Sequence, residues 1–237
     1  MNKDESQPKI GILMLQTRFP RLTGDIGSAS SFPCSVIHHV VQDAVVDEIV
    51  TAHGVNPELS QRFIDAAESL EAKGVSVIGT SCGFLSVLQS QIQSSVRIPF
   101  LSSSLLLLPT LVTQYGENAK IGVLTFDHQK LGAQHIPLAT QDIDRSVTIC
   151  GLDKSSSLYR TIAQDQTELD QAAARESVIA LLSELLEKCP DVNAIILECT
   201  NLSPWKAEIR QRAGVPVFDL VDLLMFYLNG MNNQHVE

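Results

Sequence analysis

An internal duplication constrains the fold of this chain more than any other feature of its sequence. Three apolar segments of the first half recur in the second: KIGILML (9–15) as KIGVLTF (120–126), VSVIGTSCGFLS (75–86) as VNAIILECTNLSP (192–204), and RIPFL (97–101) as GVPVF (214–218). Cys82 lies 17 residues before Pro99, and Cys199 lies 17 residues before Pro216. A cysteine and a proline at matched distances are stronger evidence of a repeat than apolar runs alone. The sequence therefore predicts two equivalent halves.

Short apolar strands alternate with helical segments along both halves. Strands are predicted at 9–15, 36–41, 75–80, 98–101, 121–126, 147–150 and 194–197. Asn56 and Pro57 form a helix cap and first-turn pair, and the apolar stripe that follows them ends at Gly74. Short buried strands separated by helices indicate a parallel sheet covered on both faces. The predicted fold class is α/β, with two pseudo-symmetric Rossmann-like halves and the active site in the cleft between them.

The two matched cysteines are the candidate catalytic residues. Cys82 and Cys199 each follow an apolar strand and precede a helix, where backbone N–H groups favour the thiolate and lower its pKa. Opposed cysteines can remove a proton from one face of a carbon and return a proton to the other face. This pattern predicts a racemase or epimerase of a small carboxylic acid, such as an amino acid or a derivative.

Residues near the cysteines are candidates for binding the substrate carboxylate and the charge that develops on it. Arg18 and Arg21 lie in the Gly- and Pro-containing loop 16–35, which has the length of a lid over the cleft, and an arginine there can clamp a carboxylate. The full predicted substrate-binding set is Thr80, Ser81, Gly83, Thr125, Thr200, Asn201 and Arg18.

Composition argues against several other classes of protein. A formal net charge of −10 does not suit a nucleic-acid partner. No apolar run approaches the roughly 20 residues of a membrane span, and the polar start resembles no export signal, so a cytoplasmic location is expected. Five cysteines without C-x-x-C spacing indicate reduced thiols and no metal site. The chain has no nucleotide-binding fingerprint, and no cofactor is expected.

Two alternatives remain open at this point. Gly79 to Gly83 fits the G-x-S-x-G nucleophile elbow of serine hydrolases, with Ser81 as nucleophile and with Asp127, His128 and His135 downstream. Against this, no HGGG-type segment occurs, and the duplicated site carries Glu198 where Ser81 stands. Two lobes around a cleft would also suit a ligand-binding protein without catalytic activity.

The duplicated halves, the cysteine after each central strand and the segment LECTNLSP at 197–204 resemble the aspartate/glutamate racemase superfamily, which includes hydantoin racemases, maleate isomerases and arylmalonate decarboxylases. The resemblance covers most of the chain. It implies a cofactor-independent enzyme that uses paired cysteines as acid and base, and a homodimer or higher homo-oligomer. It also implies that the C-terminal segment returns to the first half, so that residues 1–103 plus 217–237 form one half and residues 104–216 form the other.

Departures from the family pattern leave the substrate open. Gly83 and Phe84 follow Cys82 where amino-acid racemases carry Asn-Thr, and Asn201 stands where Glu or His commonly follows the Cys-Thr pair. The Gly-Thr-Ser before Cys82 is similar to arylmalonate decarboxylases, but those carry only the second cysteine. An arylmalonate-type decarboxylase and a maleate-type cis-trans isomerase are therefore the nearest alternatives to an amino-acid or hydantoin racemase.

Overall fold

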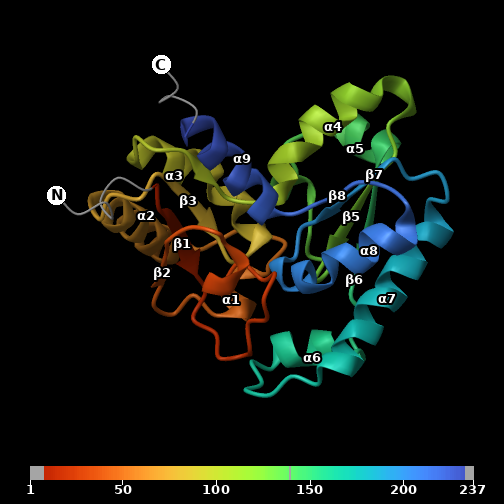
Figure 1. Ribbon diagram of the computed structural model, residues 1–237, viewed down its shortest axis with the longest axis horizontal. Coiled ribbons are helices and arrows are strands. Elements are labelled where there is room, and N and C mark those ends of the chain that lie inside the picture. Colours follow the sequence, from red (N-terminus) through yellow and green to blue (C-terminus); the bar gives the residue numbers. More distant parts are fainter. Residues whose placement is uncertain (1–7, 139, 233–237) are drawn as a thin grey trace.

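The computed structural model, which describes residues 8–138 and 140–232, contains two four-stranded parallel sheets, one in each half of the chain (Figure 1). The first sheet has the spatial order β2 (Val36–Val40), β1 (Ile10–Met14), β3 (Val77–Thr80), β4 (Phe100–Leu101). The second has the order β6 (Val147–Gly151), β5 (Ile121–Thr125), β7 (Ala194–Leu197), β8 (Val217–Phe218). Both sheets therefore have the same topology, and the predicted α/β fold class is confirmed.

The register of the strands is repeated as well. In the first sheet Ile10 pairs with Val77, and in the second Ile121 pairs with Ala194. Each central strand ends two residues before its cysteine, since β3 ends at Thr80 and β7 ends at Leu197. Parallel strands bring their carboxyl ends to one edge of a sheet, so Cys82 and Cys199 occupy equivalent positions at the two edges.

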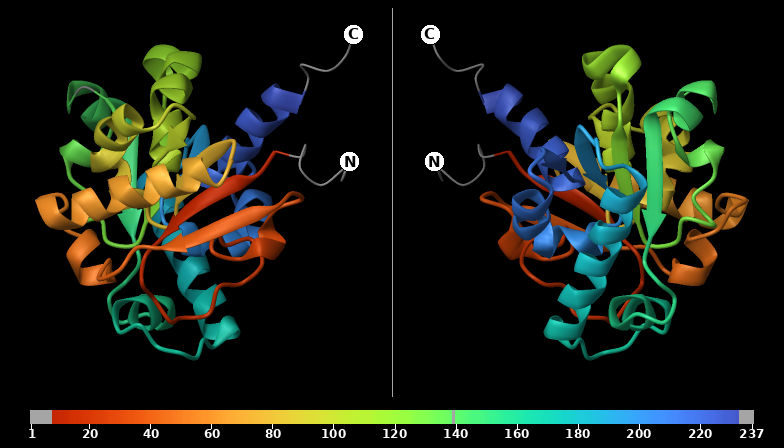
Figure 2. Two further views of the ribbon diagram at one scale, coloured as in Figure 1. Left: turned by 90° about the vertical axis from the view of Figure 1, so that its left-hand side faces the viewer. Right: turned by 90° about the vertical axis from the view of Figure 1, so that its right-hand side faces the viewer.

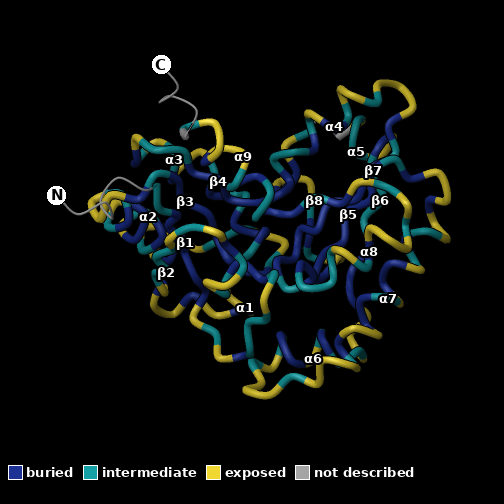
Figure 3. Tube along the Cα trace, in the orientation of Figure 1, coloured by how far each residue is buried: buried dark blue, intermediate teal, exposed yellow. Residues whose placement is uncertain are grey.

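Helices cover both sheets, and the side views in Figure 2 show them stacked against the strands. In the first half α2 (Pro57–Ala72) packs on β1 and β2, and α3 (Gln89–Ser95) packs on β4. In the second half α7 (Gln171–Lys188) packs on β5 and β6, and α8 (Lys206–Ala213) packs on β8. The inner strands β1, β3, β5 and β7 are buried along their whole length (Figure 3). The predicted capping of α2 is present, because the Asn56 side chain accepts from the N–H of Leu59 at 2.8 Å.

Two helices cross between the halves. The helix α4 (Leu108–Tyr115) follows β4 of the first sheet but contacts β5 of the second, and α9 (Leu220–Asn232) follows β8 of the second sheet but packs on β3 and β4 of the first. The helix α4 therefore packs on the second sheet although it follows the first, and α9 packs on the first sheet although it follows the second. The predicted boundaries at 103/104 and 216/217 stay a prediction, although β8 places residues 217 and 218 in the second sheet.

The remaining α-helices of the described residues are short: α1 (Val46–Ile49), α5 (Thr140–Ser146) and α6 (Ser157–Ala163). Among the helices formed by residues 8–138 and 140–232, none combines the length and the apolar character needed to cross a membrane.

Candidate active site

Both cysteines line one small pocket where the two halves meet. The pocket takes Ser81, Cys82 and Gly83 from the first half, and the run from Glu198 to Asn201 from the second. Its cavity volume is about 30 Å³, which leaves room for only a few water molecules and is far smaller than a typical ligand site. The rest of its wall is mainly apolar and includes Phe19, Val46, Val50, Phe84, Phe126 and Ile162. The duplication therefore brings two equivalent thiols to a single small pocket.

The local environments of the two thiols repeat each other. Cys82 directly precedes a 3-10 helix, Gly83–Leu88, and Cys199 directly precedes a second, Thr200–Trp205. Each sulfur accepts a backbone N–H two residues further on, from Phe84 and from Asn201 respectively. The helix-terminus setting expected at each cysteine is therefore present.

The predicted lowering of the thiol pKa is nevertheless wrong for the protein without substrate. Burial, together with the nearby Glu198 carboxylate, raises the pKa of Cys82 to about 12, against the smaller lowering effects of the Phe84 N–H and Arg21. Burial also raises the pKa of Cys199 well above its ordinary value, with Glu198 adding to the effect. Loss of water around a thiolate outweighs one hydrogen bond from the backbone. Both thiols are therefore protonated in the free protein at neutral pH.

Glu198 is the charged residue of the pocket lining that the predicted site set lacks. Its side chain is buried, its Oε2 accepts a hydrogen bond from Thr125 Oγ1 at 2.6 Å, and its Oε1 has no hydrogen-bond partner. Burial raises its pKa to about 7. The carboxyl group lies directly against Gly83, so that a Cβ at position 83 would overlap it. The sequence did contain a signal for this residue, because Glu198 replaces the neutral Ser81 of the first half at the equivalent position.

Four of the predicted substrate-binding residues line the pocket: Ser81, Gly83, Thr200 and Asn201. Ser81 Oγ accepts from the N–H of Leu15 at 2.9 Å, and Thr200 Oγ1 donates to the carbonyl of Ser81 at 3.0 Å. Gly83 and Thr200 each hold the first position of their 3-10 helix, where a backbone N–H has no partner within the helix. Gly83 and Thr200 both line the pocket, one from each half.

The other three predicted residues lie outside the pocket lining. Thr80 Oγ1 donates to the carbonyl of Ser102 at 2.6 Å, and Thr125 holds Glu198. The side chain of Arg18 is 71% exposed and its Nε lies 2.9 Å from Asp165 Oδ2. Arg18 therefore ties the first loop to the second half, and its position gives no geometric support to a role in substrate binding.

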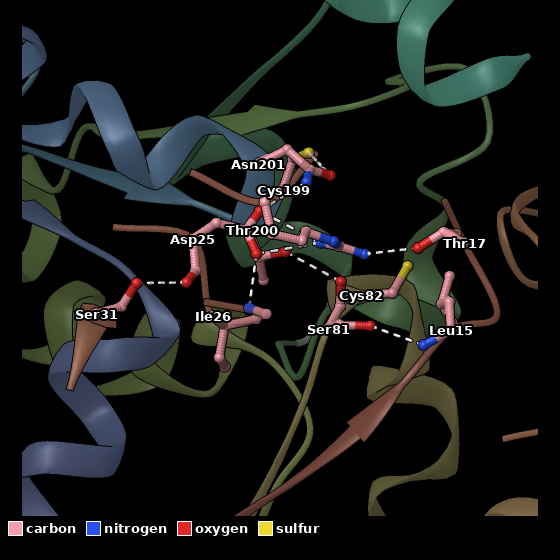
Figure 4. A network of polar contacts seen from close by, with 12 residues as sticks. Leu15, Thr17, Asp25, Ile26, Ser31, Ser81, Cys82, Cys199, Thr200 and Asn201 are labelled. Carbon is pink, nitrogen blue, oxygen red and sulfur yellow. Dashed lines mark hydrogen bonds and ion pairs between the residues drawn. The ribbon is translucent and has the colours of Figure 1, made fainter. Parts of the chain in front are cut away.

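A polar chain connects the first loop to Cys199 (Figure 4). Arg21 Nη1 lies 3.2 Å from both carboxylate oxygens of Asp25, and Asp25 Oδ2 accepts from Asn201 Nδ2 at 2.7 Å. The Cys199 thiol in turn lies 3.7 Å from Asn201 Oδ1. Arg21 is largely buried, its side chain being 11% exposed. Of the two arginines that the sequence pointed to, Arg21 is therefore the one connected to the site.

The surroundings of Ser81 do not favour a serine hydrolase. Its hydroxyl is bonded to the backbone of Leu15, and within the described residues no histidine is hydrogen-bonded to it. His135 instead packs edge-on against Phe84, with ring centroids 5.0 Å apart, and its Nδ1 accepts from the N–H of Gly132. A nucleophilic serine needs a base within hydrogen-bond reach, and this one has none in the described part of the chain.

Comparisons with known proteins agree with this architecture. The family model described as Asp/Glu/Hydantoin racemase matches residues 110–227. A dimethylsulfoniopropionate lyase of Durusdinium sp. clade D is 29% identical over 93% of this chain and 74% of its own length. Dimethylsulfoniopropionate lyase 7 of Emiliania huxleyi (strain CCMP1516) is 28% identical over 97% of this chain and 71% of its own length. The solved structure of an aspartate racemase homologue from Pyrococcus horikoshii OT3 superposes with a TM-score of 0.56 at 18% identity, covering 96% of this chain and 100% of that one.

Proposed function

Because the chain belongs to the Asp/Glu/hydantoin racemase superfamily, we propose that one pocket cysteine removes the proton next to the carboxylate of a small substrate. We further propose that the reaction is β-elimination from a sulfonium carboxylate, with dimethylsulfoniopropionate as the substrate. The observation that carries the first step is the presence of two thiols from matched positions in one pocket. The similarity over most of the chain to proteins named dimethylsulfoniopropionate lyases supports the second step.

The elimination needs one base and a stabilised carbanion. The thiolate takes the α-proton, the electrons of that C–H bond form a carbon–carbon double bond, and the bond from the β-carbon to sulfur breaks. Dimethyl sulfide leaves with the electron pair of that bond, acrylate remains, and the proton stays on the cysteine. Negative charge moves onto the carboxylate during the first step, and we propose that the backbone N–H groups of Gly83 and Thr200, at the starts of the two 3-10 helices, stabilise it.

Cys82 is the better candidate for the base. Burial and Glu198 raise the pKa of both thiols, but Arg21 lowers the pKa of Cys82, whereas Asp25 adds to the raised pKa of Cys199. In an elimination Cys199 has no proton to return to carbon, so it serves as a neutral wall and hydrogen-bond donor. In a racemisation the same thiol would supply the proton to the opposite face of the carbon.

Racemisation of a small carboxylic acid is the second candidate, and the matched thiols favour it. A single experiment in deuterium oxide separates the two reactions. We expect dimethylsulfoniopropionate to yield dimethyl sulfide and acrylate, measured by gas chromatography and NMR, and aspartate, glutamate and hydantoins to take up no deuterium. Deuterium uptake by either enantiomer of an amino acid, without sulfide release, would replace the lyase with a racemase.

The absence of a cofactor and the association into homo-oligomers stay predictions. Activity that survives dialysis against a chelator would support a cofactor-free mechanism, because the steps above use only groups of the chain. Sedimentation analysis of the purified protein tests the expected dimer.

A further inference from the structure

Glu198 is an unusual residue for a pocket with mainly apolar walls. It is buried, and its Oε1 has no hydrogen-bond partner although Oε2 is held by Thr125. The backbone N–H of Phe126 also bonds to the carboxyl group. A buried carboxyl oxygen without a partner is costly, and a bound ligand or a catalytic role is one explanation for such an atom in a native protein. The unpaired oxygen belongs to a side chain that lines the same pocket as the two thiols. This carboxylate is therefore available for a ligand.

The walls near Glu198 suit a positively charged group. Phe84 and Phe126 both line the pocket, and aromatic rings attract cations to their faces. Both rings are held in place from behind, Phe126 by stacking on Tyr159 at 4.5 Å and Phe84 by its edge contact with His135. A third ring, Phe19, makes such a contact within the protein, because the guanidinium carbon of Arg21 lies over it, 4.3 Å from the ring centroid.

We propose that Glu198, with Phe84 and Phe126, forms a cation subsite that selects small zwitterionic substrates, with a methylated sulfonium or ammonium group beside the reacting carbon. The proposal rests on the proposed function, in which the substrate carboxylate binds at the N–H groups of Gly83 and Thr200. The cation subsite would bind the positively charged end of the same substrate. The residues lining the pocket in the described part of the chain include no lysine or arginine that would repel such a cation. The apolar walls suit methyl groups, and the single free carboxylate oxygen supplies the counter-charge.

The cation subsite also explains how a thiolate forms in this pocket. The negative charge of Glu198 raises the pKa of both cysteines in the free protein. A bound cation compensates that charge, so the complex favours the thiolate more than the empty site does. A neutral substrate of the same shape would leave the thiols protonated. Recognition of the cation and activation of the base are then one event.

The test compares two ligands that differ in one atom and in charge. In 3-(trimethylammonio)propionate the nitrogen is a cation, and in 4,4-dimethylpentanoate a carbon takes its place. Isothermal titration calorimetry at pH 8 should show the zwitterion binding to the wild-type protein about tenfold or more tighter than the isostere, which has the carboxylate but no cationic group. Glu198→Gln should abolish this preference, and Glu198→Asp should retain part of it. Glu68→Gln, which removes an exposed carboxylate from α2, should leave the preference unchanged.

Two results would overturn the cation subsite: equal affinity of the wild-type protein for the two ligands, or a cation preference that persists in Glu198→Gln. If the second result came with a loss of turnover, Glu198 would be assigned to proton transfer instead. Thermal melting of each variant shows whether the fold is retained, and the Asp variant covers the case in which the Gln variant does not fold. A wild-type protein that prefers the cation but releases no dimethyl sulfide would contradict the proposed lyase reaction alone.

Discussion

The buried carboxyl group of Glu198 should make the stability of the protein depend on pH in a defined way. Its pKa rises from an ordinary value of 4.5 to about 7 in the folded chain. Each change of one in pKa corresponds to about 1.4 kcal/mol, so the rise is worth about 3 kcal/mol. Below pH 4.5 the group is neutral in both states and has no effect. As the pH rises from 4.5 through 7, the Glu198 carboxyl group ionises in the unfolded chain before it ionises in the folded chain. The folded state therefore loses about 3 kcal/mol of stability over this range.

The Glu198→Gln variant isolates this effect, because the amide is close in shape, can still accept from Thr125 and does not ionise. We expect the free energy of unfolding of the variant, relative to the wild type, to increase by about 3 kcal/mol between pH 4.5 and pH 8 and to level off above that. Urea unfolding at several pH values measures the difference, and other titrating groups cancel because both proteins share them. The Glu68→Gln variant should show little difference from the wild type at any pH, since that side chain is exposed. A difference for Glu198→Gln that stays constant over this range would refute the reasoning.

Three further predictions concern the site and the fold. Cys82→Ser should lower dimethyl sulfide release by about 100-fold or more, the usual contribution of a general base, whereas Cys199→Ser should retain a larger share of it; equal and complete losses would favour two-base racemisation. Arg18→Ala should leave kcat/KM for dimethylsulfoniopropionate within about twofold, because the exposed ion pair contributes at most about 1 kcal/mol, while Arg21→Ala should lower kcat/KM clearly; the reverse order in steady-state assays would restore Arg18 to the substrate site. Gly122→Ala should destabilise the protein by about 1–3 kcal/mol in urea unfolding, because its Cβ would lie 2.5 Å from a leucine side chain of α7; an unchanged midpoint would contradict the tight packing of β5 on that helix.

The fold could be predicted closely from the sequence because its signals are local. Apolar runs of four to seven residues, bounded by Gly, Pro and polar segments, mark the strands, and the spacing from cysteine to proline is repeated in both halves. In the structure that spacing becomes a repeated register, Ile78 beside Phe100 and Ile195 beside Val217. Because the number of residues between the matched cysteine and proline is the same in both halves, the strands pair in the same register. A duplication recognised in the sequence therefore predicts the strand topology of both halves.

The electrostatics of the site could not be predicted in the same way. The position of each cysteine before a helix indicated a lowered thiol pKa, and the expected N–H donors are present. The depth of burial is set by the contact between the halves, which no local pattern reports, and it reverses the sign of the shift. The same limit applies to the two loop arginines. Only the folded loop shows that Arg21 turns inward to Asp25 while Arg18 reaches Asp165.

The contact between Gly83 and Glu198 links two features that the sequence shows separately. The sequence places Gly83 where amino-acid racemases carry Asn, and Glu198 where the first half carries Ser81. In the folded protein the carboxyl group of one occupies the space left by the missing side chain of the other. A cycle of Gly83→Ala, Glu198→Ala and the double variant should therefore show coupling of about 0.5–3 kcal/mol in unfolding free energy. Rescue should be incomplete, because the backbone carbonyl of residue 198 would still lie 2.6 Å from the new Cβ. Strictly additive effects in this cycle would mean that the two residues are energetically independent, and that the carboxylate is not held where the cation subsite requires it.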